Sequence, residues 1–292
     1  MTYLAERPAR RQTLRVRGLD FQLYHWAGAD PRPVLLVHGW GDSGETFQFL
    51  VDRLPPQLTL VAFDARGFGR TEWAQDGYWF PDYLADLDAI VDVLSPDRAV
   101  DLVGHSMGGN VALLYAGVRP DRVRNVVSLE GFGMLPTQPG QAPARYRDWL
   151  DEIRGGVEFA TYDDFAHFAK ILARRNPRTS PDCIEFVAHS WGQVRADGRI
   201  ELRADPRHKR VNPVLYQVEQ TEACWRQIAA KVSMVAGDQS EFAKRIDGDA
   251  SRERLLNVFR AIEFETVMGA GHMLHHERPA EVAALIAGAL GV

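Results

Sequence analysis

The sequence predicts an α/β protein in which helices cover both faces of a mostly parallel sheet. Stretches of helical periodicity alternate with apolar runs of strand length, and this alternation is typical of parallel sheets built from strand-helix-strand units. Before the first run, residues 13–16 and 21–26 flank Gly18 and Asp20, which predicts an antiparallel hairpin. We therefore expect a doubly wound sheet of about eight strands, mixed at one end, whose remaining strands cover residues 34–37, 58–63, 100–103, 123–129, 232–236 and 262–267.

The expected helices lie between these strands. The last one follows Pro279, and proline suits the first turn of a helix because its missing N–H has no helical partner there. The periodic stretches cover residues 47–54, 83–94, 107–118, 252–261 and 280–290.

Composition limits the domain count and the partners. At 292 residues, with 46% hydrophobic and 25% charged content, the chain lies near the upper size for one hydrophobic core. The net charge of -5 offers no basic surplus for nucleic acid or anionic lipid, so we expect neither a nucleic-acid nor a membrane partner. The sequence composition leaves the oligomeric state open.

The compartment follows from two features of the chain. No segment approaches the roughly 20 apolar residues that span a bilayer, and residues 1–17 lack the apolar stretch of a signal peptide. Cys183 and Cys224 match no metal or redox spacing and are expected to be free thiols in a reducing compartment. We therefore expect a cytoplasmic protein without a metal or cofactor.

One region breaks the alternation of strands and helices. From 133 to 216 the sequence becomes helical and irregular, and it follows directly after the expected strand 123–129, the sixth of the chain. Open α/β sheets place ligands at the carboxyl ends of their strands. We expect a helical cap at residues 133–216, inserted into a core domain formed by residues 1–132 and 217–292, with prolines at 136, 139, 143, 177, 181, 206 and 213.

The strongest functional signal is a G-x-S-x-G turn around Ser106. The strand at 100–103 leads into GHSMG at 104–108, and a helical pattern follows. A strand that turns so sharply strains its backbone, and small neighbours at Gly104 and Gly108 let strand and helix pack closely. This context predicts that Ser106 is a nucleophile exposed at the edge of the sheet.

Four segments resemble the α/β-hydrolase family, in the family's order. They are GHSMG, VLLVHGW at 34–40, FDARGFGRT at 63–71, and GAGH at 269–272 followed by ERP at 277–279. The last resembles the family's histidine loop, so the resemblance implies that His272 is the general base for Ser106. It also implies an oxyanion hole made by the backbone amides of Met107 and Trp40.

The catalytic acid departs from the family's usual pattern. The turn that normally carries an aspartate reads GDQS at 237–240, so Ser240 occupies the expected acid position. Glu130, at the end of the strand 123–129, stands where the haloalkane dehalogenase branch of the fold has its acid. Asp238 lies two positions early, which would move its carboxylate by about 6 to 7 Å along extended backbone. We prefer Glu130 and keep Asp238 as the alternative acid.

The expected reaction is hydrolysis of a carboxylic ester through an acyl-enzyme intermediate. A serine at position 106 attacks a carbonyl carbon and forms an acyl ester, whereas the carboxylate nucleophiles of dehalogenases attack an alkyl carbon. LRADPR at 202–207 resembles the lid segment of the serine hydrolase-like branch. The lid aromatics either favour a small hydrophobic acyl substrate or pack the core of the lid itself; they are Phe159, Tyr162, Phe165, Phe168 and Trp191. The alternatives are a C-C bond hydrolase, lactonase, thioesterase or perhydrolase on the same triad, or a catalytically silent ligand-binding homologue.

Overall fold

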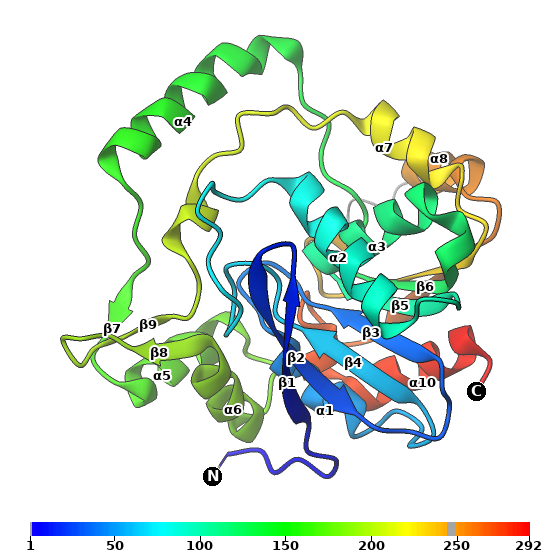
Figure 1. Cartoon of the computed structure of the whole chain (residues 1–292), viewed down its shortest axis with the longest axis horizontal. Helices are drawn as coiled ribbons and strands as arrows, with labels where there is room; N and C mark the ends of the chain where they lie inside the picture. Colours follow the sequence, from blue (N-terminus) through cyan, green and yellow to red (C-terminus); the bar gives the residue numbers. More distant parts are fainter. Residues whose placement is uncertain (1, 244–248) are drawn as a thin grey trace.

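The core of the molecule is one large twisted sheet. The computed structural model describes residues 2–243 and 249–292 (Figure 1). In this part of the chain eight strands form a sheet in the order β1-β2-β4-β3-β5-β6-β10-β11, and β2 runs antiparallel to its neighbours β1 and β4 while all other neighbouring pairs are parallel. The strands are β1 (Arg10–Val16), β2 (Leu19–Trp26), β3 (Pro33–Val37), β4 (Thr59–Phe63), β5 (Val100–His105), β6 (Val123–Leu129), β10 (Lys231–Gly237) and β11 (Ile262–Val267).

Strand order creates a switch point between β3 and β5. The chain passes from β3 to β4 on one side, then returns to add β5 and β6 on the other side of β3. Loops that leave the carboxyl ends of such neighbouring strands diverge and open a crevice between them. The loop after β3 and the turn after β5 carry Trp40 and Ser106, so the expected site residues meet at this crevice.

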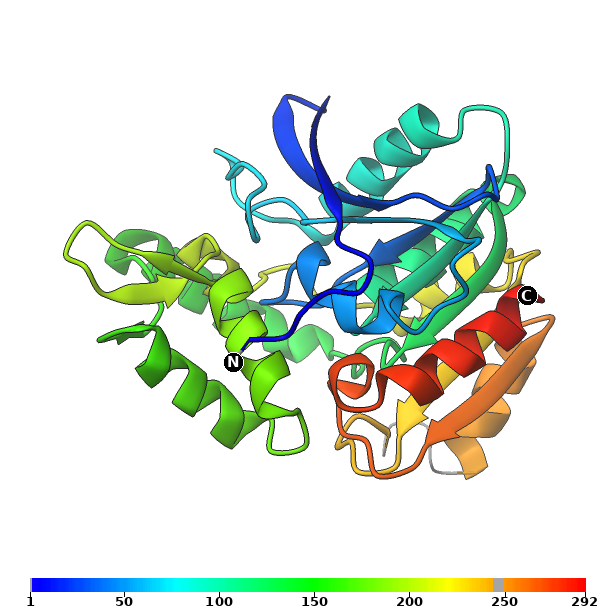
Figure 2. The same cartoon turned by 90° about the horizontal axis from the view of Figure 1, so that it is seen from below.

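Helices cover both faces of the sheet, as Figures 1 and 2 show. Alternating strand residues feed two apolar clusters: Leu102 of β5 packs into one and Val103 into the other. The first cluster includes side chains of α2 (Phe80–Leu94), α3 (Met107–Val118), α7 (Val218–Trp225) and α8 (Asp249–Val258). The second includes side chains of α1 (Gln48–Val51), α9 (Leu274–Glu277) and α10 (Pro279–Leu290).

Residues 133–216, here called the insertion, lie to one side of the core between β6 and α7 (Figure 2). Their helices are η3 (Pro139–Gln141), α4 (Ala142–Gly155), α5 (Phe165–Arg175), α6 (Pro181–Trp191) and η4 (Pro206–Lys209). The insertion also contains a three-stranded antiparallel sheet of β7 (Thr161–Tyr162), β9 (Ile200–Leu202) and β8 (Gly192–Val194). A helical region alone was expected, and the Asp197-Gly198 turn between β8 and β9 is the hairpin signal that would have indicated this sheet.

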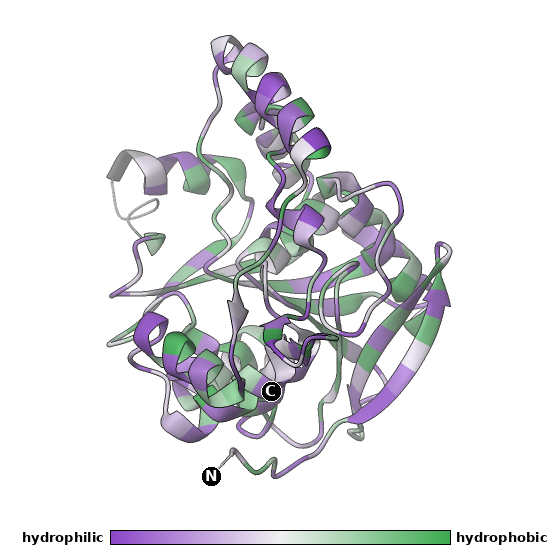
Figure 3. Ribbon diagram, turned by 90° about the vertical axis from the view of Figure 1, so that its left-hand side faces the viewer, coloured by the Kyte–Doolittle hydropathy of each residue, from purple (hydrophilic) through white to green (hydrophobic). Residues whose placement is uncertain are grey.

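The insertion has a small apolar core of its own and one exposed helix. Phe168, Ile184 and Ile200 pack together with Phe49 of the main domain. Helix α4 has no buried residue, and hydrophilic and hydrophobic residues are mixed along it (Figure 3). Its apolar side chains Tyr146, Leu150 and Ile153 are exposed.

The eight-stranded, mostly parallel sheet expected from the sequence is confirmed. The short helices η1 (Gly44–Phe47) and η2 (Pro120–Arg122) complete the core. None of the described helices combines the length and the apolar character that a membrane crossing requires.

Candidate active site

Ser106 occupies a strained turn between β5 and α3. Its φ of 51° and ψ of -112° lie outside the regions that side chains normally adopt. The flanking glycines are required by packing, because a Cβ on Gly104 would lie 2.3 Å from the Gly108 carbonyl oxygen and one on Gly108 would lie 2.0 Å from that of Val37. Such strain costs on the order of 1 to 3 kcal/mol and persists only where the surrounding structure enforces it. The turn thus holds the Ser106 hydroxyl at the crevice.

His272 faces this hydroxyl from the loop between β11 and α9. Its Nε2 lies 3.1 Å from Ser106 Oγ, which is hydrogen-bonding distance. The loop is fixed on both sides of the ring: Gly271 N donates to Glu277 Oε2 at 2.6 Å, and the His272 carbonyl oxygen lies 2.8 Å from His105 Nε2. The imidazole is therefore oriented toward the serine by its own backbone.

Glu130 approaches the other nitrogen of the ring. Its Oε2 lies 3.1 Å from His272 Nδ1, and its side chain is fully buried. Glu130 has a φ of 59°, an uncommon value for a residue with a side chain, where β6 ends. Two donors from the β10 side hold the carboxylate: Gly237 N at 2.7 Å on Oε1 and the Ser240 hydroxyl on Oε2.

Asp238 points elsewhere. Its side chain accepts hydrogen bonds from Gly269 N at 2.6 Å and from Gln239 Nε2 at 3.0 Å, and the residue is exposed. The hydrogen bond from Gln239, followed by those from the 269–270 backbone, lowers the pKa of this carboxyl. Of the two acid candidates, the structure brings Glu130 to His272. Ser240, which stands at the family's usual acid position, instead donates to Glu130.

Trp40 and Met107 lie on either side of the crevice. Met107 is the first residue of α3 and Trp40 follows β3, and within the described residues neither backbone amide donates to a protein acceptor. Amides at the start of a helix are free to bind an anion. Both residues line a cavity of about 230 Å³. The free amides and the cavity are compatible with an oxyanion hole beside Ser106.

The cavity has walls from both parts of the chain. The core contributes Tyr78, Trp79 and Tyr83, and the insertion contributes Trp149, Ile153, Arg207, His208, Arg210 and Val211. A second and mostly apolar cavity of about 580 Å³ lies across Trp79 and Phe80, between α3 and the two segments that connect the insertion to the core. The two cavities share Trp79, Phe80 and Asn212 among their lining residues.

Most insertion aromatics do not reach this cavity. Phe168 is buried in the apolar core of the insertion, with Tyr162, Phe165 and Trp191 packed against it. Phe159 lies beside Trp40, with ring centroids 6.2 Å apart, but does not itself line this cavity. The aromatic walls come instead from Trp149 and from the 78–83 segment of the core. In the sequence, the aromatic residues that pack inside the insertion and those that line the cavity look alike, because both stand among charged residues. Only the contacts in the folded structure distinguish the two groups.

Sequence reasoning also missed three residues around the triad. His105 holds the His272 carbonyl, Ser240 holds Glu130, and the ring of Phe242 stacks on that of His272 with centroids 4.2 Å apart. The signal for Ser240 was present, because it occupies the position of the missing aspartate. Asp42, His275 and His276 form the group among the described residues that could hold a metal ion.

Comparison with known proteins identifies the family of the chain. The sequence model of the alpha/beta hydrolase fold family matches residues 32–279, and the chain belongs to this family. A serine hydrolase-like protein of Danio rerio is 30% identical over 277 residues, covering 89% of this chain and 82% of that protein. The 2-(acetamidomethylene)succinate hydrolase of Mesorhizobium japonicum is 29% identical over 162 residues, covering 55% of this chain and 54% of that protein.

Among solved structures, the thioesterase domain from the curacin biosynthetic pathway superposes with a TM-score of 0.84. It is 23% identical, with 95% of this chain and 99% of that one covered. At this identity the likeness concerns the fold alone. The similar proteins include hydrolases, esterases and lipases, so the fold and the relatives agree on the broad hydrolase class.

Proposed function

We propose that this protein is a serine hydrolase that cleaves a carboxylic ester or a related acyl bond through an acyl-enzyme. The observation that carries the proposal is the continuous line from Ser106 Oγ through His272 to the buried Glu130 carboxylate, with 3.1 Å at each step. A serine hydroxyl is a weak nucleophile at neutral pH, and an adjacent imidazole activates it by removing its proton.

The proposed reaction has two halves. In the first, Ser106 Oγ attacks the substrate carbonyl while His272 takes its proton, and the amides of Met107 and Trp40 bind the oxyanion. His272 returns the proton to the leaving alcohol as the tetrahedral intermediate collapses to the acyl-enzyme. In the second, water attacks the acyl carbonyl while His272 takes its proton. The bond from Ser106 Oγ to the acyl carbon then breaks, and His272 returns the proton to Oγ, which releases the acid and regenerates Ser106. Glu130 orients the ring and stabilises the imidazolium in both halves.

We assign the insertion, residues 133–216, the role of a cap that selects the substrate. Its α4 and its 206–213 segment line the same cavity as Trp40 and Met107. A small hydrophobic acyl or alcohol group fits the aromatic walls of this cavity, and the larger apolar space beyond Trp79 and Phe80 would accept a longer chain. Lipases among the relatives support this substrate class.

A fluorophosphonate probe tests the proposal. Intact-mass analysis should find one covalent adduct on the wild type and none on Ser106→Ala, because only the activated serine attacks phosphorus. Ser180→Ala is the matched control, since Ser180 is an exposed serine before α6 and its variant should keep the adduct. An adduct that persists in Ser106→Ala would overturn the assignment, and a wild type that never reacts would indicate a silent binding protein.

A further inference from the structure

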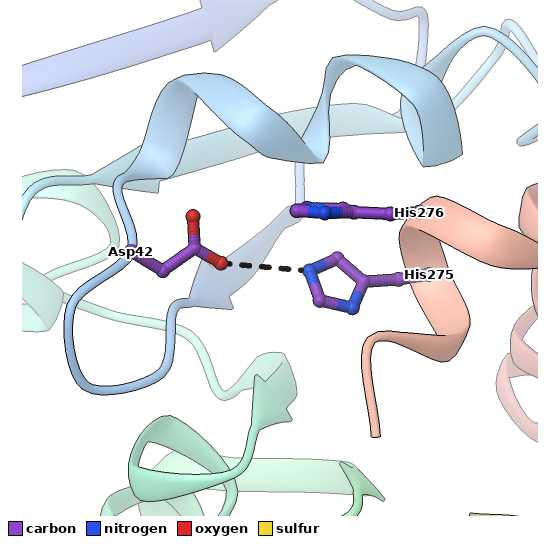
Figure 4. A group of neighbouring side chains, drawn as sticks. All are labelled: Asp42, His275 and His276. Atoms are coloured by element: carbon purple, nitrogen blue, oxygen red, sulfur yellow. Dashed lines mark ion pairs between the residues drawn. The ribbon is translucent and has the colours of Figure 1, made fainter. Parts of the chain in front are cut away.

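Behind the catalytic loop, three buried polar side chains lie together, and each has at least one nitrogen or oxygen atom with no hydrogen-bond partner among the described residues. Asp42 follows the Trp40 loop, and His275 and His276 belong to α9, three and four residues after His272. Their exposed fractions are 4%, 0% and 5%. One ligand atom from each lies within 4.8 Å of the others (Figure 4). We call these three residues the Asp42 cluster.

The hydrogen bonds of Asp42 are divided unevenly between its two oxygens. Oδ1 accepts three hydrogen bonds, from Ser43 N at 2.7 Å, Thr46 Oγ1 at 2.6 Å and Trp191 Nε1 at 2.7 Å. Oδ2 accepts no hydrogen bond from a described residue and faces His275, whose Nε2 is 3.6 Å away. The carboxylate is thus held rigidly by one oxygen while the other points at the imidazoles.

The two histidines are also left without partners. Both ring nitrogens of His275 and Nε2 of His276 are buried with no hydrogen-bond partner among the described residues. An unsatisfied buried polar atom costs about 1 to 3 kcal/mol, and native proteins rarely collect several in one place. A metal ion binds imidazole through a ring nitrogen that carries no proton.

We propose that Asp42, His275 and His276 form a binding site for a divalent transition metal ion, with Zn²⁺ as the best fit. Two imidazoles and one carboxylate are ligands typical of zinc. Ligand atoms about 2.1 Å from a tetrahedral zinc lie about 3.4 Å apart. The Asp42 and His275 atoms, 3.6 Å apart, are already close to this separation, and a ligand atom of His276 lies within 4.8 Å of both.

Such a site would connect three parts of the protein. Asp42 is hydrogen-bonded to Trp191 of the insertion, and the two histidines continue the loop of His272. His105 lies between the cluster and His272. The centroid of its ring is 4.2 Å from that of His275, and its Nε2 is hydrogen-bonded to the His272 carbonyl oxygen. Zinc would therefore fix the insertion and the catalytic histidine to the same point behind the sheet edge. It would not touch the substrate.

The test is zinc binding to the whole, chelator-treated protein. Wild type should take up one Zn²⁺ per chain by elemental analysis, and zinc at 100 times its Kd should raise Tm by about 4 °C. Asp42→Asn keeps an oxygen that accepts hydrogen bonds from Thr46 and Trp191 but removes the negative charge. This variant and His276→Gln should lose both the stoichiometric zinc and the rise in Tm. His189→Gln is the matched control, because His189 is exposed and pairs with Glu185 at i,i+4, a site for adventitious metal.

Two further measurements keep the proposal falsifiable. His272→Ala should retain the zinc, which excludes binding at the His272–Glu130 pair. Co²⁺ added to the wild type should give the visible absorption of a tetrahedral site, a readout that does not depend on whether any variant folds. A wild type that binds no stoichiometric zinc and gives no such spectrum would overturn the proposal, and so would equal zinc binding in Asp42→Asn and wild type.

Discussion

The sheet around Ser106 and the insertion above it are built in different ways. Strands β3 and β5 are buried at every position, and the residues at their carboxyl ends are held by backbone strain and hydrogen bonds. The insertion places α4 beside the site without burying any of its residues. Under the proposed function this difference separates two tasks: the core fixes the chemical groups, and α4, which has no buried residue, can vary one wall of the cavity without disturbing them.

The largest expected effect lies in the core. Ser106→Ala and His272→Ala should each lower kcat by on the order of 10⁶, because nucleophile and base act as one unit. For the same reason the double variant should be no slower than the slower single variant. Steady-state kinetics on a p-nitrophenyl ester measures this. Additive losses in the double variant would show that the two side chains act independently.

Substitutions in the insertion should change substrate preference without changing the catalytic groups. Ile153→Trp narrows the 230 Å³ cavity and should reduce kcat/KM for long-chain esters on the order of 10-fold relative to the acetate. Leu150→Trp, on the same helix but away from this cavity, is the control. Rates on p-nitrophenyl esters of graded length measure both. An unchanged chain-length profile in Ile153→Trp would mean that the insertion does not select the substrate.

Sequence patterns predicted the core better than the insertion for a physical reason. The helix at 107–118 was predicted to the residue, because a buried strand and helix carry strong apolar periodicity. Strands of two or three residues, such as β7 and β8, carry no such periodicity and form only in the folded insertion.

The three proposed triad residues also differed in how well the sequence predicted them. Ser106 and His272 stand within local motifs, whereas the position of the acid depends on contacts between segments far apart in the chain. Glu130 and Asp238 were both possible until the φ of Glu130 and its hydrogen bond from Ser240 were known. The Asp42 cluster likewise joins two distant segments, so no spacing rule could indicate it.

A substitution at the boundary between the core and the insertion should change how the free energy of unfolding depends on pH. His208 of the insertion stacks between Phe68 and Tyr78, with ring centroids at 3.8 and 3.6 Å, and burial lowers its pKa to about 3. The unfolded chain binds this proton below about pH 6.5 and the native state does not. Native stability contributed by neutral His208 is therefore present above pH 6.5 and lost as pH falls toward 3, by up to about 1.4 kcal/mol per pH unit.

Urea unfolding between pH 6 and 4.5 measures this contribution. His208→Phe keeps the stacking and cannot titrate, so its free energy of unfolding should fall less steeply with pH than that of the wild type. His167→Asn, which removes an exposed histidine of the insertion, should retain the wild-type slope. Equal slopes in His208→Phe and the wild type would show that His208 titrates normally in the native state.

The central claim is that the triad acid has moved from the β10 turn to the end of β6. The most direct measurement compares kcat for Glu130→Gln and Asp238→Asn, with circular dichroism to verify folding. Glutamine keeps the acceptor for Gly237 N but cannot stabilise the imidazolium, so Glu130→Gln should lose on the order of 10⁴ in kcat. Asp238→Asn should keep most of its activity. A folded Glu130→Gln variant with nearly wild-type kcat, beside an inactive Asp238→Asn, would contradict the claim.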